Sequence, residues 1–129
     1  MIYAFSPEGV ACLAAVLATR PLLAFDIDGT LAPIVEHPDD ARLPERVQDC
    51  LAHLARHYEV AIVTGRAVDD ARRMFAFEPR YLIGNHGAEG VPGFESASEG
   101  YARDCSKWLE ALSGEDEAWR TIPGITLED

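Results

Sequence analysis

Two kinds of hydrophobic pattern alternate along the chain. Short continuous apolar runs at residues 21–25, 60–63 and 81–83 predict strands, because strands buried on both faces of a parallel sheet carry such runs. Between the runs, apolar residues recur at three- and four-residue spacing, which is typical of helices with one buried face. The order strand, helix, strand, helix, strand predicts an α/β fold with a parallel sheet flanked by helices.

Four segments carry helix signals. Ser6 and Pro7 predict the cap and the first residue of an N-terminal helix, and Pro44 opens a second helix. A short helix around residues 69–73 has its acids first and its arginines last, the charge order that the helix dipole favours. A further amphipathic helix ends at residues 113–114, and we expect its tryptophan to pack in the core. Its apolar positions are Tyr101, Cys105, Trp108, Leu109 and Leu112.

Composition and charge narrow the class of protein. The 129 residues are 48% hydrophobic and 26% charged, which is typical of one globular domain and not of a disordered chain. The formal net charge of −11 disfavours nucleic acid and anionic lipid as partners, although a metal ion or backbone amides can hold a phosphate locally. No apolar run reaches the roughly 18 residues that span a bilayer. Three separate cysteines without a CxxC pair argue against zinc and favour a cytoplasmic location.

Polar residues with catalytic chemistry follow two of the predicted strands. Asp26 and Asp28 come directly after the first strand, and Thr64 follows the second. Gly29 permits a tight turn there, and the Thr30 hydroxyl can hydrogen-bond back into it. Because open α/β sheets bind ligands at the carboxyl ends of their strands, we expect these residues to meet in one crevice.

Two carboxylates at positions i and i+2 suit phosphoryl transfer. One carboxylate can attack phosphorus and form an aspartyl-phosphate, which divides hydrolysis into two easier steps. The other can protonate the leaving oxygen and then activate water. Magnesium offsets the repulsion between an anionic nucleophile and an anionic phosphate.

These motifs resemble those of the haloacid dehalogenase (HAD) superfamily of phosphotransferases. Residues 25–31 match its first motif, Asp-x-Asp-Gly-Thr-Leu after an apolar strand, and Thr64 matches its second. The segments 26–35, 63–66, 84–89 and 123–129 are similar to segments of the trehalose-6-phosphate phosphatase family.

The resemblance implies a Rossmann-like HAD core, incomplete, with the start of a cap region. Residues 1–90 correspond to the first half of the core, and residues 91–129 to a truncated cap. The implied activity is magnesium-dependent hydrolysis of a sugar phosphate, trehalose 6-phosphate, to trehalose and phosphate. The implied partner is therefore a small sugar phosphate.

The resemblance also assigns roles to individual residues. Asp26 corresponds to the nucleophile and a magnesium ligand. Asp28 corresponds to the general acid and base, and its backbone carbonyl to a second magnesium ligand. Thr64 corresponds to the hydroxyl that holds the transferring phosphoryl group. The full set predicted on the substrate and phosphate side is Gly29, Thr30, Thr64, Gly65, Arg66, Asn85, His86 and Gly87.

Two later motifs of the superfamily have no counterpart in the sequence. One supplies a lysine near the phosphoryl group, but the single lysine, Lys107, lies in an amphipathic helix. The other supplies further magnesium-binding acids, and Glu128 and Asp129 follow no completed core strand. Whether this 129-residue chain is active is therefore open. We also expect a bare apolar edge on the sheet, which a second copy or another chain covers.

Simpler interpretations stay open for several residues and for the whole chain. Thr64 can be a helix cap, Arg66 can pair with Asp69 or Asp70, and His86 can be a turn residue. The chain as a whole can be a non-catalytic module that binds a partner or itself. It can also be a HAD hydrolase for another small phosphate ester.

Overall fold

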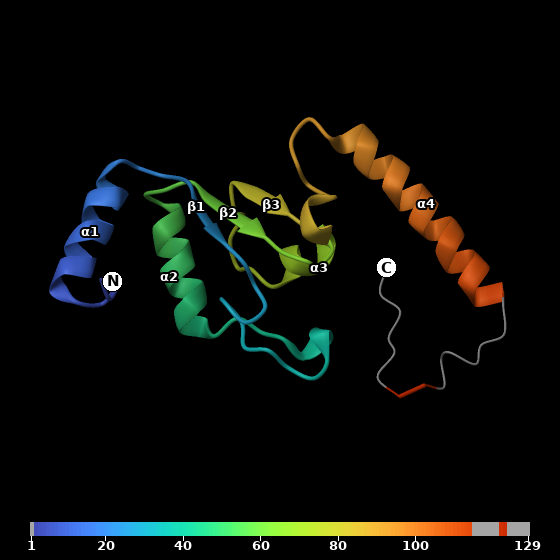
Figure 1. The fold of residues 1–129 in the computed structure, drawn as a ribbon, viewed down its shortest axis with the longest axis horizontal. Helices are drawn as coiled ribbons and strands as arrows, with labels where there is room; N and C mark the ends of the chain where they lie inside the picture. The colour runs from blue at the N-terminus through green and yellow to red at the C-terminus, as the bar shows by residue number, and fades with distance from the viewer. Residues whose placement is uncertain (1, 115–121, 124–129) are drawn as a thin grey trace.

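A computed structural model describes residues 2–114 and 122–123. Three parallel strands form one sheet in the order β1-β2-β3, and a long helix extends away from it toward the C-terminus (Figure 1). The elements, with η for a short 3-10 helix, are α1 (Pro7–Ala18), β1 (Leu23–Phe25), η1 (Pro38–Asp40), α2 (Glu45–Ala55), β2 (Val60–Val63), α3 (Val68–Arg73), β3 (Tyr81–Ile83), η2 (Asn85–Gly87) and α4 (Glu95–Gly114).

The sheet confirms the predicted α/β architecture. Phe25 pairs with Ile62, and Ile62 pairs in turn with Leu82, so the carboxyl ends of all three strands lie at one edge. The bounds of β2 and β3 agree with the prediction. β1 begins at Leu23, whose N–H donates to the carbonyl of Glu59 at 2.9 Å, whereas the expected first residue is a proline without an N–H.

A small core fixes the edge at which the strands end. Ile62 in β2 and Ile27 just beyond β1 are fully buried. Leu51 of α2 and the buried pair Val68 and Ala71 of α3 complete this part of the cluster. Because buried side chains are close-packed, the backbone on which the polar loops begin is held in place.

The helix signals near the N-terminus and in α3 are confirmed. The Ser6 hydroxyl accepts the N–H of Gly9 at 3.1 Å and so caps α1. Pro44 directly precedes α2 as its N-cap residue. In α3, each arginine of the last turn pairs with the aspartate three residues before it.

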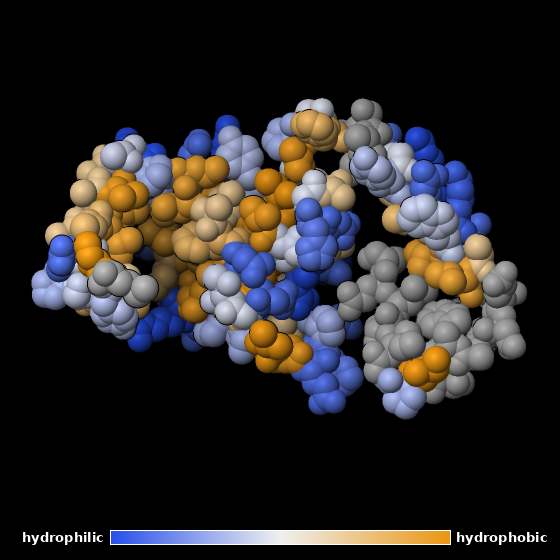
Figure 2. Space-filling view, in the orientation of Figure 1, coloured by the Kyte–Doolittle hydropathy of each residue, from blue (hydrophilic) through white to orange (hydrophobic). Residues whose placement is uncertain are grey.

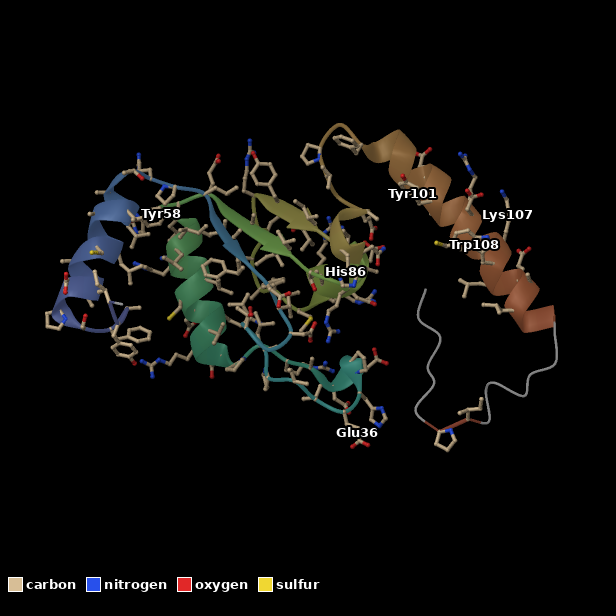
Figure 3. All side chains as sticks on the ribbon, in the orientation of Figure 1. Glu36, Tyr58, His86, Tyr101, Lys107 and Trp108 are labelled. Carbon is tan, nitrogen blue, oxygen red and sulfur yellow. The ribbon has the colours of Figure 1, made fainter. Side chains whose placement is uncertain are left out.

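The predicted core position of Trp108 is wrong. Trp108 is 66% exposed, and Tyr101 and Leu112 on the same helix are also exposed. α4 begins at Glu95 and extends away from the sheet, so its apolar side chains do not reach the strands (Figures 1 and 3). These side chains line instead a cavity of about 1250 Å³ between α4 and the loop that follows β3.

Among residues 2–114 and 122–123, no helix is both long enough and apolar enough to cross a membrane. Cys12, Cys50 and Cys105 are free thiols on the surface. The strand-like run predicted at residues 125–127 lies outside the described residues.

The buried centre of β2 provides a stability test. Ile62→Ala removes a side chain with no solvent exposure and should lower the free energy of unfolding by about 2–5 kcal/mol. Urea denaturation measures this loss. The matched control is Ile34→Ala, because Ile34 is 82% exposed and its loss should stay within about 0.5 kcal/mol. Equal losses for the two variants would contradict the described core.

Candidate active site

The turn after β1 places one buried residue between two exposed aspartates. Ile27 is fully buried, and its carbonyl oxygen accepts the N–H groups of residues 30–32 at 2.8–3.2 Å. Gly29 has a φ of +82°, a conformation that glycine adopts without strain. The side chains of Asp26 and Asp28, on either side of Ile27, are both exposed. The anchored turn therefore presents two carboxylates at the end of the strand.

A cavity of about 490 Å³ lies where β1 and β2 end. It is lined by Ala24, Phe25, Asp26, Val63, Thr64, Gly65 and His86. Thr64 is only 3% exposed, and its hydroxyl oxygen accepts the N–H of Arg66 at 3.2 Å. The Thr30 hydroxyl lies 3.4 Å from the Asp26 carboxylate, too far for a strong hydrogen bond. Asp26 and Thr64, which belong to separate sequence motifs, thus meet in one cavity.

His86 reaches this cavity through a strained backbone. Asn85 and His86 have φ values of 46° and 54°, in the left-handed region that is costly for residues other than glycine. The N–H of His86 donates to the carbonyl of Thr64 at 3.1 Å. Its ring packs so closely on Gly65 that a Cβ there would lie 2.6 Å from Cε1, and Figure 3 shows the imidazole beside the strand ends. Gly65 therefore makes room for the histidine.

Glu89 braces the same loop, a role that the motifs did not assign. Its Oε2 atom accepts the N–H of Val68 at 2.9 Å and the side-chain amide of Asn85 at 3.1 Å. It thereby caps α3, whose own N-cap residue, Ala67, makes no side-chain bond. The sequence signal that could have revealed this role is the four-residue spacing between Asn85 and Glu89, directly after a strand.

Arg66 and Asp28 form a two-pronged ion pair next to the cavity. Nε of Arg66 donates to Oδ2 and Nη2 donates to Oδ1, both at 2.7 Å. Nη2 also donates to the carbonyl of Pro38 at 3.0 Å. The hydrogen bond with Asp28 raises the pKa of Arg66, outweighing the opposite effect of its partial burial.

The structure gathers some of the predicted site residues and separates others. Asp26, Thr64, Gly65 and His86 share the smaller cavity, and Asp28 lies beside it with Arg66. The other predicted residues do not line this cavity: they are Gly29, Thr30, Asn85 and Gly87. These residues belong to the two turns beside the cavity. The side chain of Asn85 is bonded to Glu89, and the two glycines supply the positive φ values of the turns.

Two of the simpler interpretations are wrong. Thr64 does not cap α3, because the N-cap position belongs to Ala67. Arg66 forms its ion pair with Asp28, while Asp69 and Asp70 pair with the arginines of α3.

The donor chemistry at the end of β1 fits magnesium. Mg²⁺ prefers oxygen ligands, uses one or two carboxylates and keeps several waters. The exposed Asp26 carboxylate and the carbonyl of Asp28 are donors of this kind. Within the described part of the chain, no group of three or more His, Cys, Asp or Glu side chains is positioned to hold a metal ion.

The lysine lies outside the site, as its sequence context predicts. Lys107 pairs with Asp104 at 2.8 Å on α4, and its side chain is 71% exposed. In Figure 3 it projects from α4 away from the sheet.

Removal of the Glu89 brace tests the loop geometry. Glu89→Ala leaves the Val68 N–H without its acceptor and should cost about 1–3 kcal/mol of unfolding free energy. Chemical denaturation measures the loss. Glu110→Ala, at an exposed position of α4, is the matched control and should change stability by less than about 0.5 kcal/mol. Equal stability of the two variants would show that the Glu89 contacts do not stabilise the loop.

A family profile, several plant relatives and a solved structure point to one family. The profile of the trehalose-phosphatase family matches residues 24–129. Probable trehalose-phosphate phosphatase 9 of Oryza sativa subsp. japonica is 37% identical over 133 aligned positions, 92% of this chain and 36% of that protein. Probable trehalose-phosphate phosphatase D of Arabidopsis thaliana is 41% identical over 68 residues, 53% of this chain and 18% of that protein.

A solved structure shares the fold. The crystal structure of a trehalose-6-phosphate phosphatase related protein matches with a TM-score of 0.50 and 24% identity, over 70% of this chain and 44% of that one. The predicted HAD-type α/β fold, as a partial core, is thereby confirmed. The chain spans only about a fifth to a third of the length of the two plant relatives. On its sequence and its fold, the chain belongs to the trehalose-phosphatase family.

Proposed function

We propose that this chain carries the nucleophile side of a phosphatase that hydrolyses a sugar phosphate, trehalose 6-phosphate. The observation that supports this most directly is the shared cavity of Asp26, an exposed carboxylate, and Thr64, a nearly buried hydroxyl. Family membership agrees with a sugar phosphate as the substrate. Residues 1–90 form the first half of the core in this proposal, and residues 91–129 begin the cap.

In the proposed reaction, a carboxylate oxygen of Asp26 attacks phosphorus, and the bond to the sugar oxygen breaks. Asp28 enters this step in its protonated form and gives the proton to that leaving oxygen, which leaves the ionised carboxylate that pairs with Arg66. Water then attacks the aspartyl-phosphate, Asp28 takes up the proton, and inorganic phosphate leaves. The Thr64 hydroxyl oxygen already accepts an N–H, so its own proton is available to a phosphoryl oxygen.

Magnesium is the proposed cofactor, held by the Asp26 carboxylate and the Asp28 carbonyl. When bound, it neutralises charge on the phosphate and lowers the repulsion that the nucleophile meets. A cytoplasmic location accompanies the proposal, because three exposed free thiols suit a reducing compartment.

The nucleophile is tested by Asp26→Asn. The amide keeps the shape of the side chain but cannot form the phosphoenzyme, so phosphate release should fall by on the order of a thousandfold or more. The assay measures phosphate released from trehalose 6-phosphate, and from other sugar phosphates, with magnesium. Asp49→Asn, an exposed position on α2, is the control and should keep full activity. Turnover that survives in Asp26→Asn would remove Asp26 from this role.

We also propose that a second copy of the chain covers the edge of the sheet at β1. Among the described residues, β1 pairs with β2 alone. Exposed large apolar side chains gather in the same N-terminal part, where Figure 2 shows hydrophobic surface: Ile2, Tyr3, Phe5, Val10, Leu13, Val16 and Leu22. α1 carries one charge, Glu8, so two such faces can approach despite a chain charge of −11.

Sedimentation tests this association. The wild-type chain should sediment as a dimer at high concentration, and Val16→Glu should shift it toward the monomer, because burial of the new charge is costly. Ile34→Glu, at an exposed position in the loop between β1 and η1, is the control and should leave the dimer intact. A wild-type chain that stays monomeric at high concentration would contradict the proposal.

A further inference from the structure

We propose that Arg66 is a positioning residue for Asp28 and does not itself contact the phosphate. The inference rests on the proposed function, in which Asp28 moves the proton. It differs from the prediction from resemblance, which placed Arg66 among the groups on the substrate side.

The guanidinium of Arg66 binds the Asp28 carboxylate through two hydrogen bonds at once. Two parallel N–H bonds of 2.7 Å join Nε and Nη2 of Arg66 to the two carboxylate oxygens of Asp28. A planar fork of donors matches a carboxylate in this way, and a lysine cannot do so. The Arg66 side chain is only 15% exposed and that of Asp28 is 40% exposed, so water screens the pair only in part.

The backbone of Arg66 is fixed on both sides. Its N–H donates to the Thr64 hydroxyl at 3.2 Å, and its carbonyl accepts the N–H of Asn85 at 2.9 Å. Gly84 permits this approach, since a Cβ there would lie 2.6 Å from the Arg66 carbonyl oxygen. The guanidinium therefore starts from an anchored backbone, which lets it define where Asp28 lies.

The direction of the side chain argues against phosphate contact. Arg66 does not line the cavity that Asp26 and Thr64 share. Its Nη2 instead reaches the carbonyl of Pro38 at 3.0 Å, at the start of η1. Arg66 thus ties Asp28 to the loop around η1, and the carboxylate has one defined starting position beside the nucleophile.

The experiment compares Arg66→Gln and Arg66→Lys with Arg72→Gln, an equal charge change at an exposed pair on α3. The first readout is hydrogen exchange of the Asp40 and Ala41 amides, which bond to carbonyls at residues 37 and 38. Arg66→Gln should speed their exchange by about tenfold, as expected for losing hydrogen bonds to a charged group. Asp28→Asn should also speed it, and the double variant should show less than the product of the two effects.

The second readout separates positioning from substrate contact. With magnesium present, Arg66→Gln should bind inorganic phosphate within about twofold of wild type, and KM should change as little. Its kcat should fall by about tenfold to a hundredfold, because a misplaced proton donor loses part of the general-acid effect. Arg66→Lys should recover part of kcat, and Arg72→Gln should match wild type throughout.

Three results would overturn the inference. One is phosphate binding weakened tenfold or more by Arg66→Gln, which would make Arg66 a substrate contact. The second is unchanged exchange at Asp40 and Ala41 in Arg66→Gln. The third is a double variant in which the effects of Arg66→Gln and Asp28→Asn on exchange simply multiply. A wild-type chain without phosphatase activity would refute the proposed function instead. The exchange and phosphate-binding results would still decide whether Arg66 positions Asp28.

Discussion

The candidate site depends on the burial of one side chain, Ile27. It lies between Asp26 and Asp28 and has no solvent exposure, while its carbonyl receives three N–H groups of the following turn. A buried branched side chain and a saturated carbonyl leave this turn little freedom. The two carboxylates are therefore held at the end of β1, where both remain exposed. Both carry charge, so their full burial would be costly.

A second constraint is close packing against two glycines, Gly65 and Gly84, where a side chain would not fit. The ring of His86 occupies the space beside Gly65, and the carbonyl of Arg66 lies against Gly84. The left-handed conformations of Asn85 and His86 cost energy, and the Glu89 brace together with the bond from His86 to Thr64 offsets it. Strain of this kind is typical of functional loops, and here it brings an imidazole into the cavity that Asp26 also lines.

Charge limits what the site can bind. The chain carries twice as many acids as bases, and its lysine is paired on α4 away from the cavity. Among the described residues, Arg66 is the cation paired with Asp28, and it bonds both carboxylate oxygens. A phosphate approaching Asp26 therefore meets two carboxylates and depends on an added cation and on neutral donors such as Thr64. This explains why magnesium and positioning, more than direct basic contacts, dominate the proposed chemistry.

The sequence by itself determined the elements and the chemistry of their ends. The bounds of β2 and β3, the Ser6 cap and the proximity of Asp26 to Thr64 followed from local patterns and from the rule that parallel strands end at one edge. Only the tertiary structure decided the partner of Arg66, which is 38 residues away in sequence, and the bracing role of Glu89. It also decided that Trp108 is exposed. Periodicity reports which face of a helix is apolar, whereas the surface that this face meets depends on how distant segments pack.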